Sequence, residues 1–171
     1  MGNGHSTISP GNRAAARALG LNRFPHMGPL DVAVWSEFLI RAGTGGAIAR
    51  YDVLVGEGRR RGPEAEDDDE VAYRNLLRKR VDVVLSRPGL DLVLEVKPIG
   101  GMSALGQALV YRDLYWQTDN AAQEISAAVV CGVADLDCLL TYQVQGVGLW
   151  ESESGEWLAP AVPVARRSAR T

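Results

Sequence analysis

Residues 80–97 read RVDVVLSRPGLDLVLEVK, and the prediction of the fold starts from this stretch. It consists of two apolar runs separated by Pro88-Gly89, a pair that suits the central positions of a type II turn. The pattern predicts a β-hairpin in which Arg87 faces Leu90. In that register, the numbers of paired residues add up to 177.

The predicted register gathers polar side chains on one face of the hairpin. Asp82 falls directly opposite Glu95, and Lys97 falls opposite Arg80. Opposite residues point to the same face, as do residues two apart on one strand, so Asp82, Glu95 and Lys97 share a face near one end. The other face is expected to be apolar and to contain Val81, Val83, Leu85, Leu92, Leu94 and Val96.

Further elements are expected on both sides of the hairpin. Apolar periodicity after a proline predicts a helix over 30–42, and β-branched and aromatic residues predict a strand over 47–55. The other expected segments are a charged loop at 56–70, a helical turn at 71–79, helices at 103–116 and 135–142, and strands at 125–132 and 146–151. The order helix, three strands, helix, strand predicts the α/β class, with a mixed central sheet flanked by helices.

The length of 171 residues and the hydrophobic content of 46% suit one domain with its own core. We expect an irregular N-terminal arm at 1–29, a single domain at 30–160 and a basic C-terminal tail at 161–171. The sequence has no apolar run long enough for a membrane span, and we expect no secretory signal. Its two cysteines are too few for a disulfide scaffold or a zinc site, so a cytoplasmic protein is expected.

The charges are strongly segregated along the chain. Lys and Arg number 18 against 21 Asp and Glu, for a net charge of -3. Residues 64–70, EAEDDDE, contain six of the acids, and without them the balance is 18 basic to 15 acidic residues. Only Lys79 and Lys97 are lysines among the basic residues. The net charge therefore does not exclude a nucleic-acid partner, because a basic face can lie beside a solvated acidic loop.

The predicted cluster has a definite chemistry. Two adjacent carboxylates repel each other unless a cation neutralises them, and Mg²⁺ accepts carboxylate oxygens while keeping several waters. A metal held by Asp82 and Glu95 could polarise a phosphate, and Lys97 could orient a water or neutralise developing charge. These parts suit phosphodiester hydrolysis. The alternative is a surface cluster in which Lys97 and Arg80 simply neutralise the two acids.

At these residues the sequence resembles the PD-(D/E)xK nuclease superfamily, which includes restriction enzymes, junction resolvases and phage exonucleases. The resemblance covers roughly residues 30–132. It rests on VDVVL with Asp82, on LEVK with Glu95 and Lys97, and on GQALVY with Gln107 and Tyr111. It implies a restriction-endonuclease-like αβββαβ core, the order already expected from the pattern. One departure is that Val81, not proline, precedes Asp82, as in many members of the superfamily.

The resemblance also implies roles for individual residues. Mg²⁺ or Mn²⁺ would be bound by Asp82 and Glu95, with Glu37 of WSEFL approaching the metal from the first helix. Lys97 would assist the attacking water, and Gln107 and Tyr111 would match a Q-x-x-x-Y pattern found in several members. Simpler interpretations remain open, since Glu37 could pair with Arg41, and Gln107 and Tyr111 could form a polar helix edge.

Three functions follow from these observations. The first is a Mg²⁺-dependent deoxyribonuclease, with DNA contacts expected from Arg78, Lys79, Arg80 and Arg112. The second is an assembly protein that uses the nuclease fold as a scaffold, for example in a phage particle, because the domain is small and shows no separate DNA-recognition module. It would imply a homo-oligomer or larger assembly, and a virion-associated location if the protein is phage-encoded. The third is a module that binds DNA without cutting it.

Overall fold

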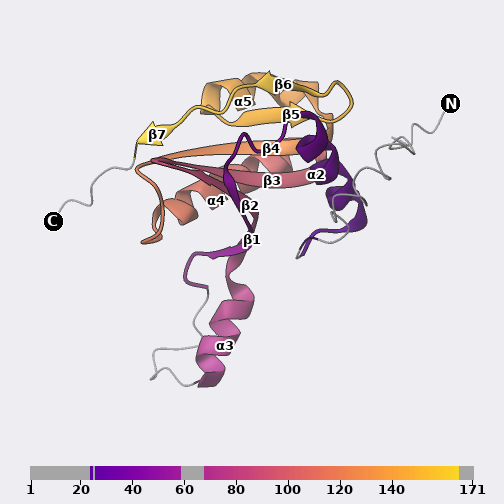
Figure 1. Cartoon of the computed structure of the whole chain (residues 1–171). Coiled ribbons are helices and arrows are strands. Elements are labelled where there is room, and N and C mark those ends of the chain that lie inside the picture. The colour runs from indigo at the N-terminus through magenta and orange to yellow at the C-terminus, as the bar shows by residue number, and fades with distance from the viewer. Residues whose placement is uncertain (1–23, 25, 59–67, 166–171) are drawn as a thin grey trace.

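The computed structural model describes residue 24 and residues 26–58 and 68–165 (Figure 1). A seven-stranded sheet has the order β1-β2-β3-β4-β5-β6, and β7 pairs with β4. Its strands are β1 (Ile48–Val55), β2 (Lys79–Arg87), β3 (Leu90–Gly100), β4 (Glu124–Ala134), β5 (Gly148–Glu151), β6 (Glu156–Ala159) and β7 (Val164–Ala165). The helices are α2 (Pro29–Arg41), α3 (Asp68–Leu77), α4 (Met102–Trp116), the 3-10 helix η1 (Leu136–Cys138) and α5 (Leu139–Gln145).

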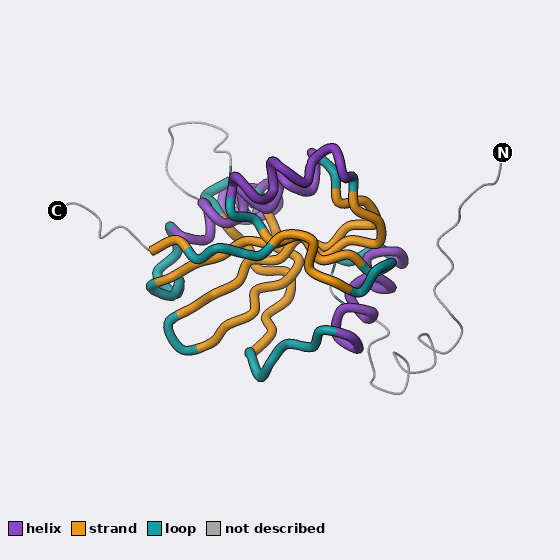
Figure 2. Tube along the Cα trace, turned by 90° about the horizontal axis from the view of Figure 1, so that it is seen from above, coloured by secondary structure: helices purple, strands orange, loops and turns teal. Residues whose placement is uncertain are grey.

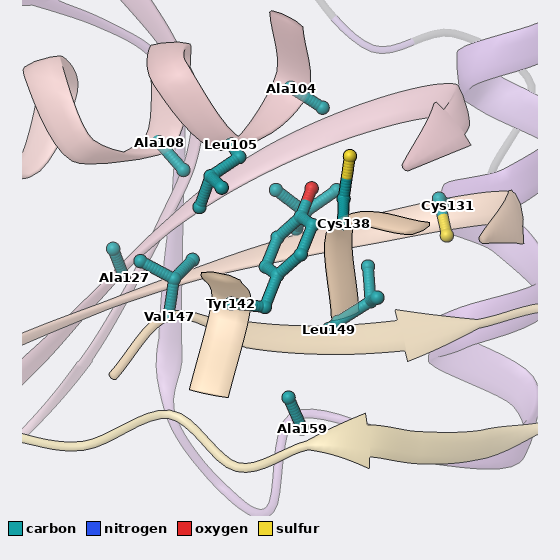
Figure 3. Packing of buried hydrophobic residues seen from close by; sticks show 11 residues of the cluster. Ala104, Leu105, Ala108, Ala127, Cys131, Cys138, Tyr142, Val147, Leu149 and Ala159 are labelled. Atoms are coloured by element: carbon teal, nitrogen blue, oxygen red, sulfur yellow. The ribbon is translucent and has the colours of Figure 1, made fainter. Parts of the chain in front are cut away.

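The sheet is mixed and has helices on both faces, which confirms the predicted α/β class (Figure 2). The pairs β1–β2, β2–β3, β5–β6 and β4–β7 are antiparallel, whereas β3–β4 and β4–β5 are parallel. Apolar residues of α2, including Trp35 and Phe38, pack against one face of the sheet. Residues of α4 and α5 pack against the other face, where Tyr142 of α5 lies close to Leu105 of α4 (Figure 3).

The hairpin register follows the prediction over most of its length. Five pairs, from Arg87–Leu90 to Val83–Leu94, all have numbers that add up to 177. The ladder then stops one pair before Asp82 and Glu95. The prediction that these two residues form a ladder pair is therefore wrong, although the register brings them to the same end of the hairpin.

The expected apolar face is confirmed except at Val81. Val83, Leu85, Leu94 and Val96 pack with α2, and Leu92 lies at the margin of that cluster. Val81 instead packs with Val84 and Val93 in a third cluster on the α4 side. The change of side occurs next to Asp52 of the neighbouring strand, which has a φ of 53° and lies between the Tyr51–Val83 and Val53–Val81 pairs.

Several predicted boundaries differ from the structure. The helical turn expected at 71–79 is the longer helix α3, which projects away from the sheet between β1 and β2 (Figure 1). The helix expected at 135–142 is η1 followed by α5, and Gly146 ends α5 in the left-handed conformation that glycine adopts without strain. The strand expected at 146–151 begins at Gly148, and β6 and β7 were not expected.

The predicted arm and tail are both partly joined to the domain. Phe24 and Met27, within the predicted arm, pack against the α2 cluster. Val164 and Ala165, within the predicted tail, form β7 on the edge of β4. The other residues of the two segments lie mostly outside the described ranges. Within the described ranges, no helix is both long enough and apolar enough to cross a membrane.

A buried polar network fixes the turn end of the hairpin to α4. The Tyr115 hydroxyl donates a 2.7 Å hydrogen bond to Asp91 Oδ2, which also accepts one from the backbone N–H of Ala122 at 2.9 Å. Arg50 donates to the Tyr115 hydroxyl and to Ser86 Oγ. Asp91 and Tyr115 are both buried, so these bonds replace hydration that the folded chain removes.

We expect Tyr115→Phe to lower the free energy of unfolding by about 1–3 kcal/mol, because Asp91 would lose a direct partner in a buried position. Urea denaturation at neutral pH measures this change. Tyr142→Phe is the control, since it removes a single longer hydrogen bond, 3.3 Å, to the carbonyl of Gly101 and should cost less. Equal stabilities for wild type and Tyr115→Phe would show that the network contributes nothing.

Candidate active site

The candidate site lies where β2 and β3 separate. Beyond the Val83–Leu94 pair, β2 stays hydrogen-bonded to β1, whereas β3 continues beside β4 as far as Gly100. The space left by the missing ladder is bridged by a side chain, since Asp82 Oδ2 accepts a 2.9 Å hydrogen bond from the backbone N–H of Val96. The separation of the strands thus turns two neighbouring carboxylates toward one position.

Lys97 is the cation shared by the two acids. Its Nζ lies 2.6 Å from Glu95 Oε1 and 3.8 Å from Asp82 Oδ2. Glu95 is only 1% exposed, and its second oxygen, Oε2, is buried without a hydrogen-bond partner. Asp82 and Lys97 are partly exposed. Asp82 and Glu95 therefore form an acidic site that solvent can reach on the Asp82 side, and its buried oxygen, Glu95 Oε2, has no hydrogen-bond partner in the protein.

Burial shifts the pKa of both acids of the site. Burial, and then the negative charge of Asp82, raise the pKa of Glu95 to about 7 despite its bond to Lys97. Burial also raises the pKa of Asp82, although the Val96 N–H and the Lys97 charge oppose the shift. Desolvation lowers the pKa of Lys97, but the bond to Glu95 and the two negative charges outweigh it, so the net shift is upward. Lys97 therefore stays protonated at neutral pH.

The helix after the hairpin contributes Tyr111 to the site. Burial and the negative charge of Glu95 raise the pKa of the Tyr111 hydroxyl, which stays protonated at neutral pH. Gln107 lies one turn earlier on α4, and its amide donates a 3.0 Å hydrogen bond to Ser103 Oγ. Tyr111 thus lies close enough to the acidic pair for the charge of Glu95 to shift its pKa. A role of Gln107 in the site stays a prediction.

The first helix presents a different carboxylate from the one expected. Glu37 forms a 2.6 Å ion pair with Arg41, the simpler interpretation of its spacing. Asp31, in the first turn of α2, is the α2 acid that acts on the pair: after burial and the nearer charges, its charge adds a smaller contribution to the raised pKa of Asp82 and Glu95, and after Glu95 and Asp82 to that of Lys97. Sequence reasoning missed Asp31 because an acid at a helix start is usual for capping, and Asp31 does accept a hydrogen bond from the Gly28 N–H. A metal role for Glu37 stays a prediction.

Strand β1 contributes another acid, Asp52, which lies close to Asp82 of β2. Asp52 binds Arg80, and its Oδ2 lies 3.1 Å from His26 Nε2. Its Oδ1 is buried without a partner, and its charge contributes to the raised pKa of Asp82. The signal available in the sequence was a single acid in the middle of a strand whose other charged residue is Arg50.

The predicted DNA-contacting residues are spread around β2 and α4. Lys79 is exposed at the start of β2, and Arg78 donates to the carbonyl of Leu54. Arg112 is mostly covered and pairs with Asp113. Arg80 is held by Asp52 and does not neutralise the acidic pair, so the alternative of a surface cluster neutralised by Lys97 and Arg80 does not describe this site.

The residues present suit a hard divalent cation. Asp82 and Glu95 supply carboxylate oxygens, one of them without a protein partner, and Mg²⁺ is usually bound through one or two carboxylates, waters and substrate phosphates. In the described ranges, no three His, Cys, Asp or Glu side chains form a ready metal-binding group. A metal here would therefore take its other ligands from water or substrate.

Comparison with protein-family models, with curated proteins and with solved structures gives no match for this chain. The interpretation of the site therefore depends on its own residues and geometry.

Proposed function

We propose that this protein is a Mg²⁺- or Mn²⁺-dependent nuclease that hydrolyses DNA phosphodiester bonds, with the site design of the PD-(D/E)xK nucleases. The observation that carries the proposal is the buried acidic pair with too little positive charge. Asp82 and Glu95 share one lysine, and Glu95 Oε2 has no hydrogen-bond partner. A buried carboxylate in this state costs free energy, which a bound divalent cation would offset.

Each residue of the site can be given a chemical task. Asp82 and Glu95 would hold the metal, which when bound would polarise the phosphate and lower the pKa of a water. Lys97 stays protonated and lies close to both acids, so it is placed to orient that water or to neutralise charge on the phosphate. Tyr111 keeps its proton at neutral pH and can donate a hydrogen bond to a phosphate oxygen.

Basic residues near the strand ends would position the DNA backbone. Lys79 is exposed at the beginning of β2, three residues before Asp82, and Arg78 precedes it. Such contacts raise affinity for any sequence and weaken as salt increases. We therefore assign Lys79 to binding of the DNA backbone and Lys97 to hydrolysis of the phosphodiester bond. Alanine substitutions of these two lysines can then be compared directly.

Cleavage of plasmid and linear DNA in Mg²⁺ or Mn²⁺ tests the proposal. We expect wild-type activity to be lost in EDTA and to fall by at least about 100-fold in Lys97→Ala, because charge stabilisation at the reacting phosphate is removed. Lys79→Ala should lose less than about tenfold and recover at low salt, because it removes one phosphate contact.

The same assay separates this function from its alternatives. An assembly protein built on the nuclease fold would show no metal-dependent cleavage by the wild type. A DNA-binding module would bind DNA with strong salt dependence, and its binding would survive Lys97→Ala. Absence of cleavage by wild-type protein on both substrates and in both metals would sink the proposal.

A further inference from the structure

Two exposed apolar ridges lie on α4 and on the η1–α5 segment, and the α4 ridge runs beside Gln107 and Tyr111 of the same helix. On α4, Met102, Gly106 and Val110 follow one another at intervals of four residues and are all exposed. On η1 and α5, Leu136, Leu140 and Val144 have the same spacing and are also exposed. Residues four apart lie on one side of an α-helix, so the α4 residues share one side, as do Leu140 and Val144 of α5, and Leu136 precedes them on η1. We call the surface made by these six residues the α4–α5 face.

The α4–α5 face points away from the sheet. The opposite sides of the same helices contribute Leu105, Ala108 and Tyr142 to the core between helices and sheet (Figure 3). The middle of α5 is joined to the beginning of α4, where the Tyr142 hydroxyl donates to the carbonyl of Gly101. The two ridges therefore belong to one layer and look outward together.

The composition of this layer is unusual for a solvent-facing surface. Neither residues 98–111 nor residues 138–150 contain any charged side chain. A surface helix normally carries charged and polar residues opposite its core face. Here Met102 is 80% exposed and Leu140 is 70% exposed. Side chains of this size and exposure, with Ile99 at the margin, present on the order of 700 Å², above the few hundred Å² typical of a monomer and close to the area that one partner buries in a standard interface.

We propose that the α4–α5 face is a homodimer interface, occupied by the same face of a second copy of this chain. In a two-fold dimer the same patch meets itself, so any charge near its centre would oppose its own copy. The exposed acids next to the ridges are Asp137, beside Leu136, and Asp113, beyond Val110, so both lie at the edges of the face. The uncharged centre meets this requirement.

The shape of the ridges also suits helix-on-helix packing. Ridges made of residues four apart interdigitate in the commonest class of helix packing in globular proteins. At Gly106 a side chain would meet nothing within 4 Å, so the α4 ridge has a gap between Met102 and Val110 that can receive a side chain of the other copy. Nucleic acid and anionic lipid are poor occupants, because the face contains neither basic residues nor aromatic stacking platforms.

Sedimentation velocity of the full chain tests the interface without reference to catalysis. We expect the wild type to sediment as a dimer at micromolar concentration, and Leu140→Glu to raise the dimer dissociation constant at least about 100-fold, because two buried carboxylates would be placed in the interface. Leu136→Glu, on the same ridge, is expected to act alike. Both positions are exposed in the protomer, so circular dichroism should be unchanged.

The control is Leu76→Glu on α3, which replaces a side chain of similar exposure, 76%, outside the α4–α5 face. It should leave the dissociation constant within about threefold. A wild type that remains monomeric at 100 µM, or a dimer that both ridge variants leave intact, would overturn the proposal. A dimer that Leu76→Glu disrupts and the ridge variants do not would place the interface on α3 and equally refute it.

Discussion

Asp82→Asn is expected to weaken Mn²⁺ binding by at least about 100-fold and to reduce metal-dependent cleavage below detection, since one of two carboxylate ligands becomes a neutral amide. The substitution should leave the fold intact. An asparagine oxygen can still accept the Val96 N–H, and the loss of one negative charge relieves the repulsion that raises the pKa of Glu95. Calorimetric titration with Mn²⁺ measures the effect directly.

The matched control for this titration is Asp119→Asn, an exposed acid in the loop between α4 and β4. Its Mn²⁺ affinity and cleavage should equal those of the wild type. Glu37→Gln answers the remaining question about α2. Unchanged Mn²⁺ affinity is expected if Glu37 serves only its pairing with Arg41, whereas Asp31→Asn should shift the affinity because the Asp31 charge acts on the acidic pair. Equal binding by wild type and Asp82→Asn would contradict the metal site itself.

The hairpin was the most predictable part of the molecule, and its physics explains why. The Pro88-Gly89 turn fixes where the strands reverse, and the two-residue period then determines every pair between Arg87–Leu90 and Val83–Leu94. The end of the ladder depends on partners elsewhere in the chain. β1 is kinked at Asp52 and β3 continues along β4, and neither contact can be read from residues 80–97.

The residues of the candidate site also differ in how far the sequence predicts them. Asp82, Glu95 and Lys97 could be predicted because the hairpin register brings them to the same end of the hairpin. Asp31 could not be predicted, since its approach depends on how α2 packs on the sheet and its position at a helix start has a sufficient local explanation. For Glu37, both the metal role and the Arg41 pair were compatible with the spacing, and only the side-chain geometry favours the pair.

Glu95→Gln is expected to stabilise the metal-free protein at alkaline pH while removing its response to metal. The pKa of Glu95 is raised from its ordinary value of 4.5 to about 7, so the folded state binds more protons than the unfolded state between these values. Stability must then fall as pH rises through this window, by up to about 3 kcal/mol for a shift of this size. A glutamine cannot ionise, so the variant should not show that loss.

Urea denaturation in EDTA at pH 5 and pH 8 measures the difference. Wild type and Glu95→Gln should be similar at pH 5, where Glu95 is protonated, and the variant should be more stable by about 1–3 kcal/mol at pH 8. Glu156→Gln, an exposed acid on β6, is the control and should follow the wild type at both values. A variant less stable than wild type at pH 8 would mean that the bond between Glu95 and Lys97 stabilises the fold on balance.

Adding Mn²⁺ at pH 8 should reverse the order of stabilities. A metal that binds only the folded state stabilises it by about 4.1 kcal/mol at a thousand times its dissociation constant, which exceeds the expected difference at pH 8, and the wild type alone should gain this amount. A purely structural ion pair predicts the opposite pattern, in which Glu95 supports the fold at every pH and metal changes nothing. Burial and mutual repulsion raise the pKa of both acids in spite of Lys97, which is the condition expected of groups arranged for a cation rather than for stability.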